Sequence, residues 1–284
     1  MKVHLSVMLL ARKVARQQQL AAIKHSNRDW SGFWGCWNED TIVETKNCRE
    51  NAVSERRKNK IGTDGQWANQ YSWIKVRSYW VLVIMLSNWP SEDVLAHYCL
   101  SHRDIFRSKK VIELGSGYGL AGFVIAAVTE ASEVAISDGN PQVVDYTQRN
   151  IEANTGAFGD TVVKSMMLHW NQEDTSSVAD TFDIIVASDC TFFKDFHKDL
   201  VRTVKHLLSK TESSEALFLS PKRGNSLDLF LEVAKENGLH FSVTENYDKE
   251  VWKRHEGFLN GSDRDSWPSY ETGHCYPLLI KITL

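Results

Sequence analysis

The sequence predicts a doubly wound α/β fold, in which a mostly parallel, seven-stranded sheet is covered by helices on both faces. From residue 88 onward, short apolar runs alternate with longer amphipathic ones, as expected for strands joined by crossover helices. The run 182–187 is almost continuously apolar, which is typical of a strand buried on both faces. A glycine-rich turn joins the first strand of the series to a helix, as at the ligand edge of such sheets.

The elements follow in a regular order after a first helix at 89–99. Pro90 and the acidic residues Glu92 and Asp93 mark the start of this helix. The apolar residues Val94, Leu95 and Tyr98 share one of its faces. The expected strands are 110–114, 133–137, 162–168, 182–188, 216–220, 239–245 and 277–283, and the expected helices between them are 119–128, 141–154, 196–209 and 227–237.

Residues 1–87 differ from this pattern and predict a divergent, largely irregular N-terminal segment ahead of a domain at 88–284. The stretch 30–37 is aromatic without periodicity, and 50–60 is polar and charged. The first 28 residues contain Lys and Arg but no acid before Asp29, which fits a disordered basic tail or an organelle transit peptide. We expect the disordered tail.

Composition restricts the classes of function. The net charge of -3 and the lack of long Lys/Arg runs in the C-terminal two thirds argue against a nucleic-acid partner. The 5 cysteines are scattered without a C-x-x-C pair and the 10 histidines form no ligand cluster, so we expect no metal and a reducing compartment. No apolar run approaches the roughly 20 residues of a membrane span. We therefore expect a monomer in the cytoplasm, the nucleus or both.

The turn after the first strand, 115–122, contains four glycines and can be aligned in two registers. From Gly117 it matches G-x-G-x-x-G, a pattern that binds dinucleotides. From Glu113 it matches E-x-G-x-G-x-G, the loop of S-adenosylmethionine-dependent methyltransferases. We favour the second register because the apolar strand runs directly into Gly115. In either register Asp138, which follows the second strand, is placed to contact a ribose diol.

Polar or aromatic residues follow four of the predicted strands. In doubly wound sheets the carboxyl ends of the strands form the ligand edge. We therefore expect the glycine loop, Asp138-Gly139-Asn140, His169-Trp170 and the segment 188–192 to converge.

Several of these segments together resemble the calmodulin-lysine N-methyltransferases, which are seven-β-strand protein lysine methyltransferases. The resemblance extends from about residue 88 to the C-terminus. Its motifs are Trp89-Pro90-Ser91-Glu92, Glu113-Leu114-Gly115-Ser116-Gly117, Ser137-Asp138-Gly139-Asn140, Leu168-His169-Trp170, Ser188-Asp189-Cys190-Thr191-Phe192, Pro221-Lys222-Arg223-Gly224-Asn225, Glu245-Asn246-Tyr247-Asp248 and Tyr276-Pro277-Leu278-Leu279. Residues 1–87 do not resemble the usual N-terminal segment of the family.

The resemblance implies a Rossmann-like class I fold, S-adenosylmethionine as cofactor and a lysine of calmodulin as substrate, carried to the trimethylated state. Asp189 is the expected catalytic residue, because its carboxylate could accept a hydrogen bond from the amine. Phe192 offers an aromatic face to the ammonium or its stem. Glu113 either binds the methionine amino group or orients the loop. The expected cofactor-binding residues are Trp89, Glu113, Gly115, Ser116, Gly117, Asp138, Asn140, Trp170 and Ser188.

Other interpretations stay open at this point. Asp189 can be a turn residue, and each tryptophan can be packed in the core. The candidates for a basic patch that receives acidic calmodulin are Lys222-Arg223, Lys249 and Lys253-Arg254-His255, although these residues can also be simply solvated. The alternatives to the function are a lysine methyltransferase with another protein substrate, a nicotinamide-dependent enzyme, and a non-catalytic binding module.

Overall fold

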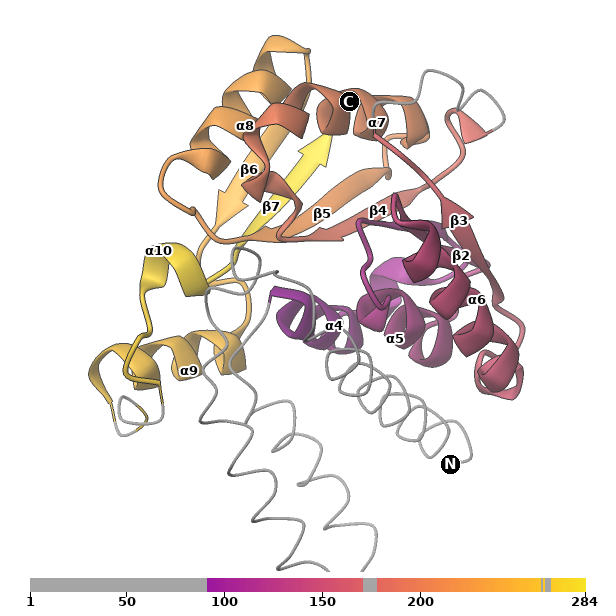
Figure 1. Ribbon diagram of the computed structural model, residues 1–284, viewed down its shortest axis with the longest axis horizontal. Helices are drawn as coiled ribbons and strands as arrows, with labels where there is room; N and C mark the ends of the chain where they lie inside the picture. The colour runs from indigo at the N-terminus through magenta and orange to yellow at the C-terminus, as the bar shows by residue number, and fades with distance from the viewer. Residues whose placement is uncertain (1–90, 171–177, 262, 264–266) are drawn as a thin grey trace, which may run out of the picture. The chain divides into compact units, whose positions relative to one another are not determined.

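The computed structural model describes residues 91–170, 178–261, 263 and 267–284 (Figure 1). The predicted N-terminal segment 1–87 and the site candidate Trp89 lie outside the described residues. The described part is built around one seven-stranded sheet with the order β3-β2-β1-β4-β5-β7-β6. This arrangement confirms the predicted doubly wound sheet.

Parallel pairing dominates the sheet. Strands β1 to β5 pair in parallel, whereas β7 pairs antiparallel with both β5 and β6. The strand bounds are β1 (Lys110–Leu114), β2 (Glu133–Asp138), β3 (Val162–Met167), β4 (Ile184–Ser188), β5 (Glu215–Ser220), β6 (His240–Thr244) and β7 (Leu278–Thr283). Each lies within two residues of the predicted bounds.

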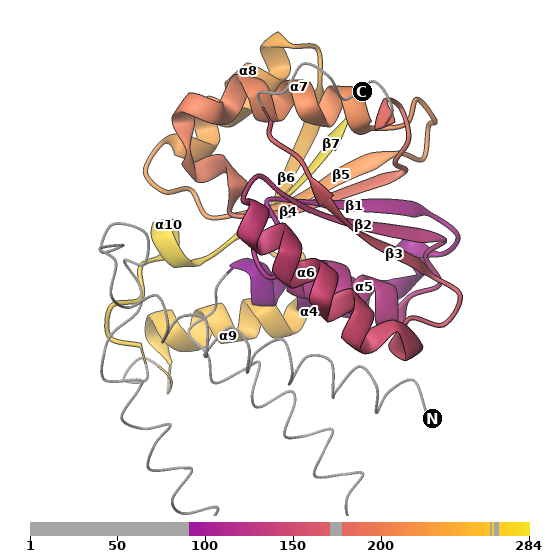
Figure 2. The ribbon, with the colours of Figure 1, turned by 45° about the vertical axis from the view of Figure 1, so that its right-hand side comes forward.

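Helices cover both faces of the sheet, as the two ribbon views agree (Figures 1 and 2). One face carries α4 (Ser91–Ser101), α5 (Leu120–Val128) and α6 (Pro141–Asn154). The other carries α7 (His197–Leu207) and α8 (Ser226–Glu236). Among the described residues, none of the helices is long and apolar enough to cross a membrane.

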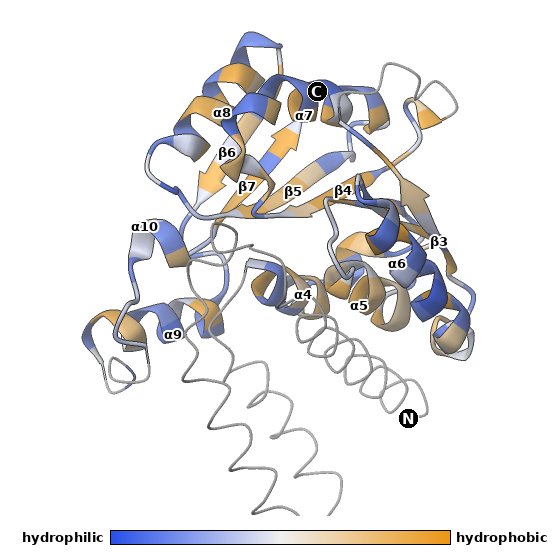
Figure 3. Cartoon of the chain, viewed as in Figure 1, coloured by the Kyte–Doolittle hydropathy of each residue, from blue (hydrophilic) through white to orange (hydrophobic). Residues whose placement is uncertain are grey.

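The core lies along the central strands, and its pattern follows from the sequence. Residues 184–187 of β4 are at most 2% exposed, as a strand covered on both faces requires. Val94, Leu95 and Tyr98 of α4 are buried on the predicted face. Figure 3 shows the hydrophobic colour concentrated in the central strands and in α5. The edge strand β6 is exposed along its whole length, whereas the other edge strand, β3, is half-buried in its central residues.

Two helices between β6 and β7 were not predicted: α9 (Lys249–Asn260) and α10 (Thr272–Cys275). The side chain of Asp248 caps α9, because its Oδ1 accepts hydrogen bonds from the amides of Glu250 at 2.8 Å and Val251 at 3.1 Å. The Tyr247 hydroxyl donates to the Pro277 carbonyl at 2.9 Å and thereby connects the start of α9 to the start of β7. An Asp in this position followed by Glu250 was the available sequence signal for the helix.

Candidate active site

The glycine loop between β1 and α5 has the backbone that its sequence predicts. Gly115, Gly117 and Gly119 have φ of +59°, +52° and +74°, in the left-handed region that glycine enters without a steric penalty. The Ser116 amide donates to the Ser137 carbonyl of β2 at 2.9 Å, which fixes the loop against the neighbouring strand. A Cβ placed on Gly117 would meet no atom within 4 Å, so the space above this residue is open.

Asp138, at the end of β2, connects the glycine loop to the turn between β2 and α6. Its Oδ2 accepts a hydrogen bond from the Gly117 amide at 3.0 Å, and its Oδ1 accepts one from the Asn140 amide at 2.8 Å. The side-chain oxygen of Asn140 accepts from the Gln142 amide at 2.9 Å and caps α6. Asp138 remains partly exposed on the side of the loop. The structure therefore brings Gly117, Asp138 and Asn140 together at the carboxyl ends of β1 and β2.

Glu113 lies beneath the loop and is 1% exposed. Its Oε2 accepts a hydrogen bond from the Gly122 amide at 2.9 Å, in the first turn of α5. A Cβ on Gly122 would lie 2.5 Å from this oxygen, so the close approach of helix and carboxylate requires glycine. Burial, together with the charge of Glu92, raises the pKa of Glu113 well above its usual value. Of the two roles considered for Glu113, these contacts favour orienting the loop.

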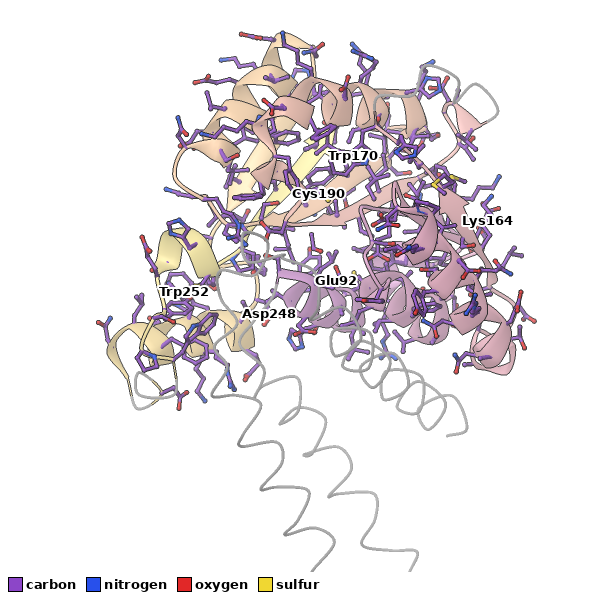
Figure 4. All side chains as sticks on the ribbon, viewed as in Figure 1. Glu92, Lys164, Trp170, Cys190, Asp248 and Trp252 are labelled. Atoms are coloured by element: carbon purple, nitrogen blue, oxygen red, sulfur yellow. The ribbon has the colours of Figure 1, made fainter. Side chains whose placement is uncertain are left out.

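Trp170 and Cys190 form a wall beside the first glycine. A Cβ on Gly115 would lie 3.1 Å from Cζ2 of Trp170 and 2.9 Å from Sγ of Cys190. Cys190 is buried, and burial raises the pKa of its thiol well above the usual value, which keeps it neutral. Figure 4 shows Trp170 and Cys190 near each other above the central strands. The segments after β3 and β4 therefore converge with the glycine loop, as predicted.

Glu92 of α4 reaches the same edge, although the sequence identified it only as an acidic residue at the start of the helix and as part of a motif, not as a site residue. Its Oε1 accepts a hydrogen bond from the Ala121 amide at 2.9 Å, and its Oε2 accepts one from the Ser188 hydroxyl at the end of β4. Glu92 and Ser188 are 96 residues apart in the sequence. A single glutamate in a helix's first turn carries no signal that would have indicated this position.

Asp189 directly follows β4 and forms an ion pair with Arg223. The Arg223 Nε donates to Oδ1 of Asp189 at 2.9 Å, and Nη2 donates to Oδ2. Arg223 thus belongs to this site rather than to a separate surface patch. The guanidinium carbon lies 5.2 Å from the ring centre of Phe192. The two predicted catalytic residues, Asp189 and Phe192, are therefore brought together around one arginine.

An exposed aromatic surface borders this pair. Phe192, Phe193 and Phe196 are 46%, 40% and 42% exposed, which is unusual for three phenylalanines within five residues. Their rings meet edge to face, with centroids 5.2 Å apart for the first two and 6.3 Å for the last two. The Phe196 ring is in turn 6.3 Å from that of Trp170. An apolar surface thus extends from the glycine-loop wall to Asp189.

These residues fit S-adenosylmethionine, whose sulfonium and ammonium outweigh its single carboxylate in charge. The space above Gly117 is open, and Trp170 provides an aromatic wall beside the neighbouring Gly115. The carboxylates of Glu92 and Asp138 lie at this edge, where they accept hydrogen bonds from the Ala121 and Gly117 amides. Their negative charge favours a cationic ligand. The strand order with an antiparallel β7, the glycine loop and Asp138 define the chain as a class I S-adenosylmethionine-dependent methyltransferase fold.

Comparison with known proteins specifies the family. A family profile described as lysine methyltransferase matches residues 71–237. A calmodulin-lysine N-methyltransferase of Arabidopsis thaliana is 64% identical over 199 residues, which are 70% of this chain and 65% of that protein. The chain belongs to the lysine methyltransferase family.

More distant relatives match a little over half of the chain. Methyltransferase-like protein 22 of Mus musculus is 30% identical over 174 residues, covering 55% of this chain and 44% of that protein. Protein N-lysine methyltransferase METTL21A of Xenopus tropicalis is 30% identical over 161 residues, covering 56% of this chain and 69% of that protein. The chain spans less than two thirds of the length of the Arabidopsis and mouse relatives.

Proposed function

We propose that this chain is a protein-lysine N-methyltransferase that transfers methyl groups from S-adenosylmethionine to a lysine of calmodulin, up to the trimethylated state. The observation that carries the substrate assignment is the 64% identity to a calmodulin-lysine N-methyltransferase. The geometry adds a partly exposed carboxylate and an aromatic ring at the ligand edge, which are groups suited to a lysine amine and its methylated products.

The cofactor is expected to lie on the glycine loop between Asp138 and Trp170. When bound, S-adenosylmethionine would supply its sulfonium methyl group: the amine nitrogen bonds to the methyl carbon in line as the C–S bond breaks, and the electron pair of that bond leaves with the neutral thioether. Gly115 and Gly117 expose backbone to the ligand because they carry no side chain. Glu92 and Ser188 form one side of the same region through their mutual hydrogen bond.

The acceptor amine must arrive without its proton and with its lone pair directed at the methyl carbon. Positioning of this kind accounts for much of the catalysis of such displacements. Asp189 accepts a hydrogen bond from the neutral amine and thereby orients it. The face of Phe192 stabilises the methylated, positively charged product. The proton released from the amine passes to solvent at this exposed edge.

The test is transfer of labelled methyl from S-adenosylmethionine to unmodified calmodulin, with mass spectrometry to count the methyl groups on each lysine. Asp189→Asn is expected to lower kcat by about 10²–10³-fold, the usual range for removing one preorganised hydrogen-bonding group at the reacting atoms. Asparagine tolerates the left-handed backbone of Asp189, whose φ is +51°, so the fold should persist. The matched control is Asp195→Asn, an exposed aspartate on the same segment, which should keep full activity.

The outcomes separate the alternatives. Transfer to calmodulin that is lost only in Asp189→Asn supports both substrate and residue. Binding of S-adenosylmethionine without transfer to calmodulin, but with transfer to another protein in a whole-proteome assay, contradicts the substrate. Cofactor binding without transfer to any protein would indicate a non-catalytic module. Binding of a nicotinamide dinucleotide in place of S-adenosylmethionine would refute the cofactor.

A further inference from the structure

The ion pair between Asp189 and Arg223 has an unusual construction. Both residues have a left-handed backbone, with φ of +51° and +45°, which is uncommon outside glycine. The Arg223 amide donates to the Gly273 carbonyl at 2.7 Å, so the arginine's backbone is attached to α10. Its guanidinium packs against Phe192. Strained positions that are maintained by several contacts occur preferentially at functional sites.

The charge of the pair matters for a lysine acceptor. A lysine ammonium ordinarily loses its proton near pH 10.4, so an enzyme working at neutral pH must favour the neutral amine. An isolated carboxylate would do the opposite, because an opposite charge stabilises the ammonium. The Asp189 and Arg223 side chains are 31% and 25% exposed, and together they carry no net charge.

The geometry still leaves Asp189 able to contact the substrate. An ionised carboxylate has about four lone-pair positions, and Arg223 occupies two of them. The remaining positions can accept an N–H from a neutral amine. A second cation close to the amine also disfavours its protonated form, as in enzymes that activate a lysine beside another positive group.

We propose that Arg223 is a positioning residue that neutralises the charge of Asp189, so that this carboxylate orients a neutral lysine amine instead of trapping the ammonium. The inference rests on the proposed lysine methyltransferase function and concerns the acceptor side of the same site.

Other titratable and charged groups on the surrounding elements also influence the pH dependence of the reaction, so they must be the same in every Arg223 variant. They are Glu92 and Asp93 of α4, Glu113 of β1, Asp138 of β2, Cys190 and Lys194 after β4, Lys222 before Arg223, and Glu271 and His274 at α10. None of these residues is altered in the Arg223 variants, so a change between profiles reports on the guanidinium.

The experiment measures kcat and KM for calmodulin from pH 6 to pH 10 in the wild type, Arg223→Gln and Arg223→Lys. The rising limb of the plot of kcat against pH reports deprotonation of the amine. Removing one charge a few ångströms from the amine, in a partly exposed site, should raise the apparent pKa of this limb by about one unit. Near pH 7 the kcat of Arg223→Gln should therefore fall about tenfold and recover toward wild type at pH 10. Its KM should stay the same or decrease, because the bare carboxylate binds the ammonium.

Two controls make the readout specific to the charge. Arg223→Lys keeps a cation, so its limb should stay close to that of the wild type even if its overall activity falls. Lys235→Gln removes the same charge from an exposed residue in the last turn of α8 and should leave the profile unchanged. Arg223→Asn provides a second neutral variant, since asparagine tolerates a positive φ, and circular dichroism shows which variants are folded. Equilibrium binding of calmodulin without cofactor should be as tight or tighter in the two neutral variants.

A loss of kcat by the same factor at every pH in Arg223→Gln would overturn the inference, because a merely structural role predicts parallel profiles. An identical upward shift in Arg223→Lys would overturn it as well. These failures differ from failure of the proposed function, in which the wild type itself transfers no methyl to calmodulin.

Discussion

Two glycines with the same backbone but different surroundings allow a sharp test of the cofactor site. Gly117 and Gly159 have φ of +52° and +57°, and a Cβ on either would meet nothing within 4 Å. Gly117 lies in the glycine loop, whereas Gly159 lies in the exposed turn before β3. Substitution by alanine therefore imposes the same local strain at both positions, but it places a methyl group in the cofactor's space at only one of them.

The magnitudes follow from these facts. A left-handed conformation costs a residue with a Cβ roughly 1–2 kcal/mol, and the lower entropy of the unfolded chain offsets about 0.4–1 kcal/mol of this. Each variant should lose about 1 kcal/mol of unfolding free energy, which corresponds to a Tm about 2–4 °C lower. A methyl group forced against a bound ligand costs about 1–3 kcal/mol, by analogy with overpacking. The Gly117→Ala variant should thus bind S-adenosylmethionine about 5-fold to 150-fold more weakly.

Calorimetric titration with S-adenosylmethionine measures the affinity of each variant for the cofactor, and thermal melts measure its Tm. Gly159→Ala should bind the cofactor like the wild type. Wild-type affinity in Gly117→Ala would refute the placement of the ligand above this glycine. A much larger stability loss in Gly117→Ala than in Gly159→Ala would show that the space above the loop is not open.

Two further predictions concern stability against pH. Burial, together with the charge of Glu92, raises the pKa of Asp93 to about 7 in the folded protein, from an ordinary value of 3.8, so the free energy of unfolding falls as pH rises between these two values. Asp93→Asn removes the ionisation, so its Tm relative to wild type should be higher at pH 8 than at pH 4, and an equal difference at both would contradict the assignment. Burial lowers the pKa of His255 below 6.5, so the unfolded chain takes up the proton first and the wild type loses stability as pH falls below 6.5. In urea titrations, His255→Phe should flatten the dependence of the unfolding free energy on pH. The variant also loses the 2.6 Å hydrogen bond between His255 and the Tyr270 hydroxyl, which lowers its stability at every pH.

Local patterns in the sequence determined most of the sheet and the central part of the candidate site. The apolar run of β4 predicts a strand buried on both faces, and residues 184–187 are buried in this way. The glycines after β1 predict a left-handed loop, and Asn140 with Pro141 marks the start of α6. These features were predictable because each depends on residues that are neighbours along the chain.

Only the tertiary structure decided which side chains meet at the ligand edge. Glu92 reaches Ser188 across 96 residues and Arg223 reaches Asp189 across 34, and no periodicity links either pair. The place of β7 between β5 and β6 likewise depends on packing of the whole sheet. An isolated glutamate or arginine in a sequence carries no information about its partner. The partner is chosen when strands and helices that are distant in the chain bury their apolar faces together, and that choice assigned Arg223 to Asp189.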